Sequence, residues 1–507
     1  MDLTRRRLQQ DQFARKQAQS YPAFHGMHTR TKIVCTIGPA SNNPTVIADL
    51  VQAGAEIFRL NFSHGSQEQH LDVIRMIRNL SAELKRPLGI FGDLSGPKIR
   101  VGEIAGGSLE LKPKDEITFT SEQGCDGSDG RFTITFLSLH EAVRPGEEVL
   151  LDDGAMRLVV RRVRRFDVVC EVLEGGLLKP RKGVNLPQTN LTIPSMTTKD
   201  REDLEFAIRE GLDAVALSFV RRAEDLRTAK RAMDRVGARI PLIAKIEKSE
   251  AIGALEEIVA EADGVMVARG DLGVELPLEQ IPAIQKRLIR IANSMSKPVI
   301  TATQMLESMI RAPRPTRAEV TDVFNAVTDG TDAVMLSGET AAGLHPTACV
   351  EVMRRIVDQA ENDMHYSVTP DDPWMDSAAN ADLAMARAAV QLSGQLELDA
   401  IIVPTTSGST ARRVSRYRPR CPILACGLAP ERLGFCCFSW GVEPRPARPH
   451  FEHDPHAPDA PERIINESIE VFREANLLYP GMKVAVIAGV PADKPGVTNL
   501  LRVIALD

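Results

Sequence analysis

The stretch Leu242-Ile-Ala-Lys-Ile-Glu247 carries two charged side chains within an apolar run of β-strand character. Successive side chains of a strand point to opposite faces, so Lys245 and Glu247 share one face. Inside a core such a pair is costly, because each buried charge needs a partner. At the mouth of a barrel, the same pair would place a catalytic cation beside a metal ligand. The remainder of the chain decides between these two interpretations.

The composition is typical of a globular protein with several domains. A chain of 507 residues is too long for one core, and 43% apolar with 26% charged residues is typical of ordered proteins. The formal net charge is −6 and aromatic residues make up 4%, which disfavours a polyanion partner and stacking on single-stranded nucleic acid. No apolar run reaches the length of a membrane span. We therefore expect neither a nucleic-acid nor a membrane partner.

The cysteines and the first residues bear on the compartment. The chain has no Cys-x-x-Cys pair, which argues against a zinc site, and most of its cysteines lie in apolar stretches. Residues 1–29 combine the basic cluster Arg5-Arg6-Arg7 with acidic residues and lack the apolar segment of a signal peptide. We interpret them as an N-terminal arm, either a surface helix or a partly disordered tail. A reducing, cytoplasmic location is the expectation.

From Arg30 onward, short apolar runs alternate with longer segments of helical periodicity. This alternation predicts a parallel sheet wrapped by helices. The runs are Lys32–Ile37, Ile57–Phe62, Leu88–Leu94, Ala214–Val220, Ile240–Ile246, Gly264–Ala268, Pro298–Ala302 and Ala333–Leu336. Eight βα units predict a TIM barrel, in which active sites form at the carboxyl ends of the strands. Polar residues follow nearly every run, which a purely structural barrel would not need.

Two further regions extend this α/β pattern. Residues 99–186 combine short strands of period two with Asp-Gly and Gly-rich turns, which predicts a small β-barrel domain. Its insertion at the catalytic end of the barrel is typical of a lid. The barrel domain is then assigned to residues 30–98 and 187–362. Residues 375–507 repeat the α/β theme and predict a separate, open α/β domain with a regulatory role.

Ordered strings of residues resemble the pyruvate kinase family. They are Lys32–Ala40 (KIVCTIGPA), Phe58–Gly65 (FRLNFSHG), Lys182–Pro187 (KGVNLP), Ala244–Glu247 (AKIE), Ala268–Glu275 (ARGDLGVE), Thr301–Leu306 (TATQML), Pro315–Glu319 (PTRAE) and Met335–Ala342 (MLSGETAA). One string alone is weak evidence, whereas the full set in this order is highly specific. The resemblance implies a glycolytic phosphotransferase that converts phosphoenolpyruvate and ADP into pyruvate and ATP. It also implies Mg²⁺ or Mn²⁺ as the cofactor and a homotetramer.

The resemblance assigns catalytic roles to Lys245, Arg59 and Thr303. Phosphoryl transfer is mainly positioning plus cancellation of developing negative charge. Lys245 would lie against the transferring phosphate, and the guanidinium of Arg59 offers a rigid fork for phosphate oxygens. Thr303 would orient the substrate carboxylate or lie on the path of the proton that turns enolate into pyruvate. A strand residue that satisfies its own backbone is an equally good interpretation of Thr303.

Two acidic residues and a glycine complete the substrate side of the site. Glu247 and Asp271 match the ligands of the divalent cation, and hard carboxylate oxygens suit Mg²⁺ or Mn²⁺. The backbone N–H groups of Gly270 and Asp271 would receive the substrate carboxylate.

Five further positions match residues near ADP, and they are Pro39, Asn61, His64, Arg100 and Lys182. Lys182 stands at the end of the inserted domain, so closure of the lid would bring it to the nucleotide. His64 also has an ordinary structural interpretation, as a polar residue that caps a helix.

The segment Asp93–Lys98 (DLSGPK) departs from the potassium-dependent members of the family. Those members carry Glu where this chain has Lys98, and members with Lys there are generally independent of potassium. The ammonium of Lys98 can supply the positive charge that a bound K⁺ brings, so we expect K⁺ not to be required. The positions that match monovalent-cation ligands are Asn61, Ser63, Asp93 and Leu94.

The C-terminal region contains a hydroxyl-rich loop between a predicted strand and helix, made of Thr405, Thr406, Ser407, Gly408, Ser409 and Thr410. Hydroxyl and N–H groups of such a loop can cradle a phosphate. In family members activated by sugar phosphates, the effector sits on a loop of this kind and on a second loop, here around Pro491–Thr498. An unregulated structural loop fits the sequence equally well, so a sugar-phosphate or nucleotide effector stays one of two alternatives.

Two other functions are compatible with parts of the sequence. Another TIM-barrel lyase that acts on phosphoenolpyruvate or pyruvate would share a metal held by two acids, but it would not need the inserted domain or Lys182. A catalytically silent, metabolite-binding homologue would be expected to have lost Lys245, Glu247 or Asp271, and all three are present. The sequence therefore favours the kinase, without giving its effector or its nucleotide preference.

Overall fold

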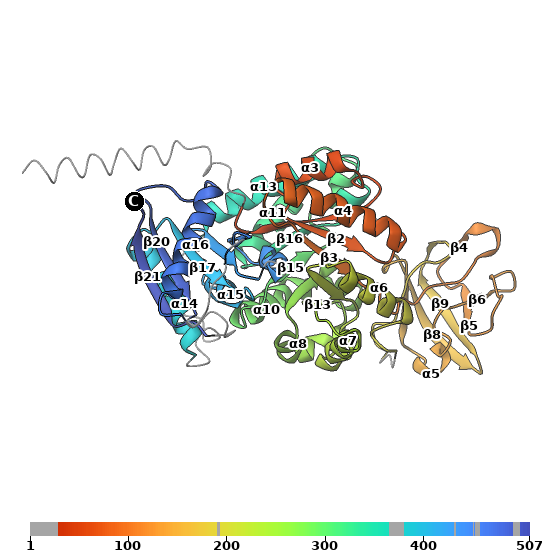
Figure 1. Ribbon diagram of the computed structural model, residues 1–507. Helices are drawn as coiled ribbons and strands as arrows, with labels where there is room; N and C mark the ends of the chain where they lie inside the picture. Colours follow the sequence, from red (N-terminus) through yellow and green to blue (C-terminus); the bar gives the residue numbers. More distant parts are fainter. Residues whose placement is uncertain are drawn as a thin grey trace, which may run out of the picture.

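The computed structural model describes residues 29–189, 193–364, 380–429, 432–449, 451, 457–489 and 497–507. The expected N-terminal arm at residues 1–29, apart from its last residue, and most of the loop around Pro491–Thr498 lie outside the described residues. The described chain forms a central barrel with a β domain on one side and an α/β domain on the other (Figure 1). No helix within these ranges is both long and apolar enough to cross a membrane.

The predicted TIM barrel is confirmed: eight parallel strands close in the order β1-β16-β15-β14-β13-β12-β3-β2. The strands are β1 (Lys32–Ile37), β2 (Ile57–Asn61), β3 (Gly89–Asp93), β12 (Ala214–Leu217), β13 (Leu242–Ile246), β14 (Gly264–Ala268), β15 (Val299–Ala302) and β16 (Ala333–Leu336). The main helices around them are α3 (Pro44–Ala53), α4 (Gln67–Glu83), α6 (Thr198–Arg209), α7 (Ala223–Val236), α8 (Leu255–Glu261), α10 (Ile281–Ser294), α11 (Arg317–Thr328) and α13 (Pro346–Asp363). Shorter helices at the strand ends are α9 (Arg269–Glu275) and α12 (Gly338–Ala341).

Local side-chain caps fix where several of these helices begin. The side chain of Asn43 accepts a hydrogen bond from the Val46 N–H at the start of α3. Ser66, Thr197 and Thr316 form capping boxes before α4, α6 and α11. Such caps satisfy N–H groups that have no partner within the helix. The turns from strand to helix at the barrel rim are therefore specified by nearby sequence.

The interior of the barrel is apolar toward the amino ends of the strands and polar toward their carboxyl ends. Inward-facing apolar residues of one buried cluster are Val34, Ile57, Phe91, Ala216 and Ile243. Alternate residues of a strand share a face. The residues two positions later are Thr36, Arg59, Asp93, Ser218 and Lys245. The sequence thus places polar side chains above an apolar base.

A short helical turn of the C-terminal domain, η6 (Gly434–Phe438), seals the amino end of the barrel. Its residues are all buried, and Phe435, Cys437 and Phe438 belong to the same cluster as the inward-facing barrel residues. The ring of Phe438 packs edge-on against Phe91, with 5.8 Å between ring centroids. This apolar seal leaves the carboxyl end for a polar site. The sequence had not predicted it.

The inserted segment forms a β domain with its own core. Six strands are hydrogen-bonded in the order β11-β7-β8-β9-β5-β6, and β10 pairs with β4 in a separate ribbon. The strands are β4 (Leu109–Leu111), β5 (Glu116–Thr120), β6 (Arg131–Thr133), β7 (Glu148–Leu151), β8 (Met156–Arg164), β9 (Asp167–Glu174), β10 (Gly176–Leu178) and β11 (Val184–Asn185). A single helical turn, α5 (Leu139–Ala142), lies between β6 and β7.

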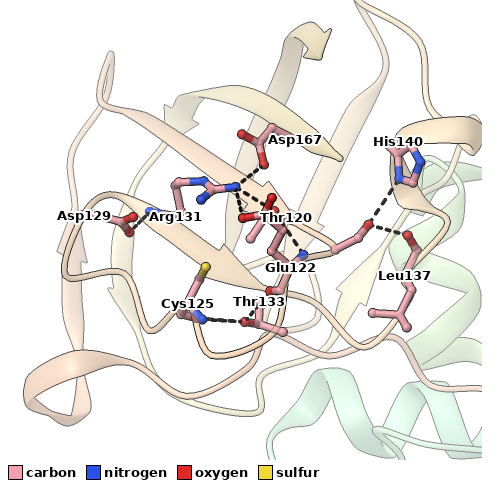
Figure 2. A network of polar contacts seen from close by, with 10 residues as sticks. Thr120, Glu122, Cys125, Asp129, Arg131, Thr133, Leu137, His140 and Asp167 are labelled. Atoms are coloured by element: carbon pink, nitrogen blue, oxygen red, sulfur yellow. Dashed lines mark hydrogen bonds and ion pairs between the residues drawn. The ribbon is translucent and has the colours of Figure 1, made fainter. Parts of the chain in front are cut away.

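A polar network ties three strand ends of this β domain together (Figure 2). The guanidinium of Arg131 lies 2.9 Å from the carboxylate of Glu122 and 2.8 Å from that of Asp167, and it also donates to the Thr120 hydroxyl. Burial raises and Arg131 lowers the pKa of Asp167, and the net result is a pKa below its usual range. The network joins the end of β5 to the starts of β6 and β9.

The C-terminal domain is a five-stranded sheet in the order β19-β18-β17-β20-β21, in which only β21 runs antiparallel to its neighbour. Its strands are β17 (Ala400–Thr405), β18 (Ile423–Gly427), β19 (Val442–Pro446), β20 (Lys483–Ala488) and β21 (Leu500–Ala505). Its helices are α14 (Ala381–Gln395), α15 (Ser409–Ser415) and α16 (Ala460–Glu474). The predicted open α/β domain is therefore confirmed.

A buried aspartate joins the barrel to this domain. One carboxylate oxygen of Asp332 lies 2.8 Å from the Arg418 guanidinium and accepts the Trp440 N–H at 3.0 Å. Its other oxygen accepts the Val299 N–H at 3.0 Å. The guanidinium of Arg418 also stacks 5.1 Å from the centroid of the Trp440 ring. Both charged side chains are largely buried, so neither can easily exchange its partner for water.

We predict that Asp332→Ala lowers the melting temperature by roughly 3–5 °C, because it leaves the buried Arg418 without its carboxylate, a loss worth about 3–5 kcal/mol. Differential scanning calorimetry measures the shift. Asp49→Ala, at an exposed position of α3, is the matched control and should melt like the wild type. Equal melting temperatures for the two variants would contradict the prediction.

Candidate active site

Asp93 is the centre of a charge cluster at the carboxyl end of the barrel. It is 2% exposed, and one of its oxygens lies 2.6 Å from Nη2 and 2.7 Å from Nε of Arg59. Its other oxygen lies 3.1 Å from Nζ of Lys245. Burial alone would raise the pKa of the Asp93 carboxyl, but Lys245 and Arg59 lower it below its usual range. Asp93 therefore stays charged and holds both cations in place.

Lys245 has two more partners. Its ammonium lies 2.7 Å from Oε1 of Glu247 and donates to the Ser218 hydroxyl at 2.7 Å. Burial would lower the pKa of Lys245, yet Asp93, Glu247 and Asp271 together raise it above its usual range. The side chain is thus a permanent cation with all its donors directed to named acceptors. Lys245 and Glu247 share one face, as the period of two predicts.

The carboxylates of Glu247 and Asp271 fit a divalent cation. Oε2 of Glu247 accepts the Phe219 N–H at 2.9 Å, which fixes the carboxylate at the mouth of the barrel. Burial raises the pKa of Glu247, Lys245 lowers it, and the negative charge of Asp271 raises it again, for a net increase. Asp271 is exposed. A hard cation between the two acids would relieve their mutual repulsion and satisfy both.

Glu247 and Asp271 alone would not complete the coordination of a metal ion. Among the described residues, no group of three or more His, Cys, Asp or Glu side chains is arranged to hold a metal ion. Oxygen atoms of a substrate or of water would have to complete the coordination of a cation there. Mg²⁺ commonly binds in this way, through one or two carboxylates and substrate phosphates.

Thr303 follows β15 in a backbone conformation that β-branched residues rarely adopt. Its φ is +68°, and the next residue, Gln304, has a φ of +54°. The hydroxyl of Thr303 accepts the Gly270 N–H at 2.7 Å and donates to the Ala302 carbonyl at 2.6 Å. Two neighbouring strands are thereby linked through one side chain. A substrate carboxylate that uses the Gly270 N–H would have to share it with Thr303.

A cavity of about 220 Å³ lies between the barrel rim and the inserted β domain. Of the predicted site residues, Lys98, Arg100, Lys182 and Asp271 line it. Pro39, Asn61 and His64 are not part of its lining. The predicted nucleotide residues are therefore only partly brought together in this structure.

Two of the cavity's cations are held by the β domain itself. The ammonium of Lys182 lies 2.7 Å from the Asp152 carboxylate, and Arg100 donates to the Arg181 carbonyl at 2.9 Å. Both contacts are at half-exposed positions, so water competes for them. A bound polyphosphate would have to draw these side chains toward the barrel.

His64 is surrounded by positive charge. Burial lowers the pKa of its imidazole, and the cations Lys98, Arg100 and Arg59 lower it further. The imidazole is therefore neutral at pH 7. Lys98 itself is exposed and lines the cavity, so its charge faces the space beside the barrel mouth.

The predicted monovalent-cation positions are largely occupied by protein contacts. Oδ1 of Asn61 accepts the Ser63 N–H at 3.1 Å, and the Leu94 carbonyl accepts the Ser218 hydroxyl at 2.7 Å. Both oxygens of Asp93 face cationic side chains, as described above. These oxygens already have hydrogen-bond or ion-pair partners without a metal.

Sequence reasoning assigned no role to four residues that shape the site. Ser218 bridges Lys245 and the Leu94 carbonyl, and Thr36 accepts from Nη1 of Arg59 at 3.2 Å. The period of two of a β-strand could have identified both side chains as facing the barrel interior, since each residue lies two positions after an inward-facing apolar residue. Buried Lys248 and Glu275 form an ion pair of 2.6 Å beside the site. This ion pair could not be predicted from local sequence, because its two residues belong to different βα units.

The hydroxyl-rich loop of residues 405–410 lies in the C-terminal domain, between β17 and α15, and not in this site. Thr405 accepts the Gly408 N–H at 2.9 Å, and Ser407 donates to Ser409 at 3.1 Å. The hydroxyls of Thr410 and Thr498 lie 3.1 Å apart. The two predicted effector segments therefore meet at Thr498.

We predict that Ser218→Ala destabilises the protein by about 1–3 kcal/mol, because one buried proton of the Lys245 ammonium loses its acceptor. Thermal unfolding at pH 7 measures the loss. Ser63→Ala is the matched control, since Ser63 is a half-buried serine of the same rim whose hydroxyl makes no hydrogen bond to the described residues. A Ser218→Ala variant as stable as Ser63→Ala would contradict the role given to this hydroxyl.

Comparison with known proteins gives a consistent result along the chain. The family model of the pyruvate kinase barrel domain matches residues 28–350, and that of the pyruvate kinase alpha/beta domain matches residues 383–504. A pyruvate kinase from Agrobacterium vitis is 43% identical over 94% of this chain and 97% of its own length. Pyruvate kinase 2 from Synechocystis is 43% identical over 94% of this chain and 79% of its own length. A Staphylococcus aureus pyruvate kinase is 40% identical, with corresponding shares of 94% and 80%. The chain therefore belongs to the pyruvate kinase family.

Proposed function

We propose that this protein transfers the phosphoryl group of phosphoenolpyruvate to ADP and so forms pyruvate and ATP. The observation that carries the proposal is the cluster at the barrel mouth, where Arg59 and Lys245 flank Asp93 and the acids Glu247 and Asp271 lie beside them. Two fixed cations next to a two-acid cation site suit a phosphoryl group that develops negative charge in transfer. A metabolite-binding homologue would not need to keep this full set.

The chain's own residues supply charge and position in this reaction. Lys245 would lie against the transferring phosphoryl group, and Arg59 would hold two of its oxygens through its planar fork. Asp93 keeps both cations aimed before substrate arrives. A divalent cation held by Glu247 and Asp271 would neutralise phosphate charge and orient the substrate oxygens. Because these groups are already fixed, little reorganisation is needed during the transfer.

The other end of the substrate would meet the Thr303 region. The Gly270 N–H donates to the Thr303 hydroxyl at 2.7 Å and that hydroxyl donates to the Ala302 carbonyl at 2.6 Å, so a bound carboxylate would have to share or take over one of these donors. Thr303 is also a candidate for the path of the proton that converts enolate into pyruvate. Its strained backbone supports a functional role, because such conformations persist where surrounding structure enforces them.

ADP would bind in the cavity between the barrel and the β domain. Lys98, Arg100 and Lys182 line that cavity, and Pro39, Asn61 and His64 lie on the barrel loops near the same mouth. Cations that line a cleft attract and orient a polyphosphate. We propose residues 99–186 as the lid, residues 30–98 and 187–362 as the catalytic barrel, and residues 375–507 as the regulatory domain.

A coupled assay for pyruvate, with phosphoenolpyruvate, ADP and Mg²⁺, tests the proposed reaction. Lys245→Met should lower kcat by about 10³-fold or more, because it removes a fixed charge beside the transferring group. The control is Lys112→Met, at an exposed lysine of the β domain, which should keep wild-type kcat. No turnover by the wild-type protein would overturn the assignment.

We propose further that Lys98 replaces a monovalent cation. Its ammonium is among the charges that depress the pKa of His64, which supports a position close to the site. The oxygens of Asn61, Asp93 and Leu94 that match K⁺ ligands already have protein partners.

The potassium proposal predicts full activity with Mg²⁺ in Tris or sodium buffer. Lys98→Glu should lose at least about tenfold in kcat/KM without K⁺ and regain part of it when K⁺ is added, because it exchanges the fixed cation for an acid that needs one. Lys112→Met again serves as control. Wild-type activity that collapses without K⁺ and returns with it would contradict the proposal.

Three finer features of the function are also proposals. A sugar-phosphate or nucleotide effector would bind at Thr405–Thr410, whose half-buried serines can turn their hydroxyls to a phosphate. The subunits would form a homotetramer, and the protein would work in the cytoplasm as an enzyme of glycolysis. Membership of the family supports each of these features.

A further inference from the structure

A second cavity, of about 380 Å³, lies at the opposite end of the barrel from the candidate active site. It is bounded by Asp213, Ile240, Pro241 and Asp263, which lie just before β12, β13 and β14, and by the C-terminal residues Ser407, Arg412, Arg432 and Phe435. The cavity therefore lies between the barrel and the C-terminal domain. Its size is within the range of pockets for small ligands.

Arg412 is a half-buried arginine with no described carboxylate within ion-pair distance. Its Nη1 donates to the Ser407 carbonyl at 3.2 Å, and its guanidinium stacks 5.7 Å from the centroid of the Phe435 ring. Burial lowers its pKa below the usual range. Within the described part of the chain, its charge forms no ion pair. Burying an unpaired charge is costly, and a guanidinium has five donors to satisfy.

Some of the other basic residues around this cavity form ion pairs with carboxylates, and one does not. Lys230 lies 2.8 Å from Glu261, and Arg239 forms a fork with Asp234 at 2.5 and 2.6 Å. Arg432 is exposed and has no ion pair among the described residues. Arg412 and Arg432 are therefore the two cations of the lining whose charge no described carboxylate in contact neutralises.

The two aspartates of the cavity lining form no ion pair with Arg412 or Arg432 among the described residues. Asp213 lies 3.0 Å from Arg78 and accepts the Ile90 N–H at 2.7 Å, so its partners are residues of the barrel domain. Asp263 accepts the Leu242 N–H at 3.0 Å, and its negative charge partly offsets the effect of burial on the pKa of Arg412, but it lies beyond ion-pair distance of that guanidinium. Asp263 also acts on the half-buried Lys297, whose pKa burial and Arg412 lower and Asp263 raises, with a net decrease. The cavity thus keeps unneutralised positive charge.

We propose that this cavity binds a small phosphate monoester, whose phosphoryl group is held by the guanidinium groups of Arg412 and Arg432. Planar guanidinium groups match phosphate oxygens through paired hydrogen bonds. The apolar side chains of Met233, Ile240 and Phe435 line the same space and can cover the remainder of a small ligand.

This site is separate from both anion sites described above. The candidate active site lies at the carboxyl ends of the same strands. Of the loop Thr405–Thr410, only Ser407 lines the cavity. The inference does not rest on the proposed kinase activity, because binding is measured directly.

Isothermal titration with glycerol 3-phosphate, without substrates, tests the proposal on the full-length protein. The wild type should bind it, and Arg412→Gln should weaken binding at least about tenfold, because a charged hydrogen-bond partner of the phosphoryl group is lost. Arg432→Gln should weaken it several-fold. The matched control is Arg235→Gln, an exposed arginine in the last turn of α7, which should bind like the wild type.

Two further variants separate this site from the others. Lys245→Met alters the candidate active site and Ser409→Glu alters the hydroxyl-rich loop, and neither should change the affinity of the titrated site. Titration with inorganic phosphate shows whether the phosphoryl group alone suffices, and glycerol is the uncharged comparison. Saturating ligand should raise the melting temperature of the wild type and not that of Arg412→Gln, because a ligand stabilises only the state that binds it.

The outcomes are decisive in both directions. Should Arg412→Gln prove unstable on its own, the exposed Arg432→Gln substitution decides the question. Binding that is unchanged in both arginine variants overturns the proposal. So does an affinity lost in Lys245→Met or Ser409→Glu but kept in Arg412→Gln, or a wild type that binds no glycerol 3-phosphate up to about 10 mM.

Discussion

A single buried carboxylate makes the polar end of the barrel possible. Arg59 and Lys245 belong to different strands, and both direct their positive charge into the same narrow mouth. Without Asp93 between them, these cations would repel each other in a region of low dielectric. With it, each cation has a partner at 2.6–3.1 Å, and the apolar residues below can exclude water. The geometry is thus set before any ligand enters.

The backbone adds a second constraint at the ends of the strands. Phe219 has a φ of +58° and Thr303 a φ of +68°, both unusual for bulky or β-branched residues. In each case the conformation brings a polar group onto a functional neighbour: the Phe219 N–H onto Glu247 and the Thr303 hydroxyl onto the Gly270 N–H. Strain of this kind persists when surrounding packing compensates for it. Here the compensation comes from the buried core around the barrel.

The features that the sequence predicted well are those with a local, periodic signal. Eight apolar runs predicted eight strands, and a period of two correctly put Lys245 and Glu247 on one face. Residues tied by contacts between distant segments were missed. The ion pairs of Asp93 with Arg59 and Lys245 had no signal in the sequence, and its match to a monovalent-cation ligand stays a prediction. The seal formed by Phe438 in the barrel could not be predicted either, because nothing near it in the sequence indicates a partner so far away.

The inserted β domain shows why an arrangement for nucleotide binding cannot be read from residue types alone. Lys182 is paired with Asp152 at 2.7 Å, with the two side chains 36% and 31% exposed. Such a half-exposed pair contributes only about 0–1 kcal/mol, so a polyphosphate can take the lysine at little cost. The last strand of the domain contacts the barrel through a different kind of residue. The amide of Asn185 in β11 lies 3.5 Å from the Glu275 carboxylate, which also forms an ion pair with buried Lys248. Where these side chains point therefore depends on tertiary contacts between the β domain and the barrel rather than on any one segment.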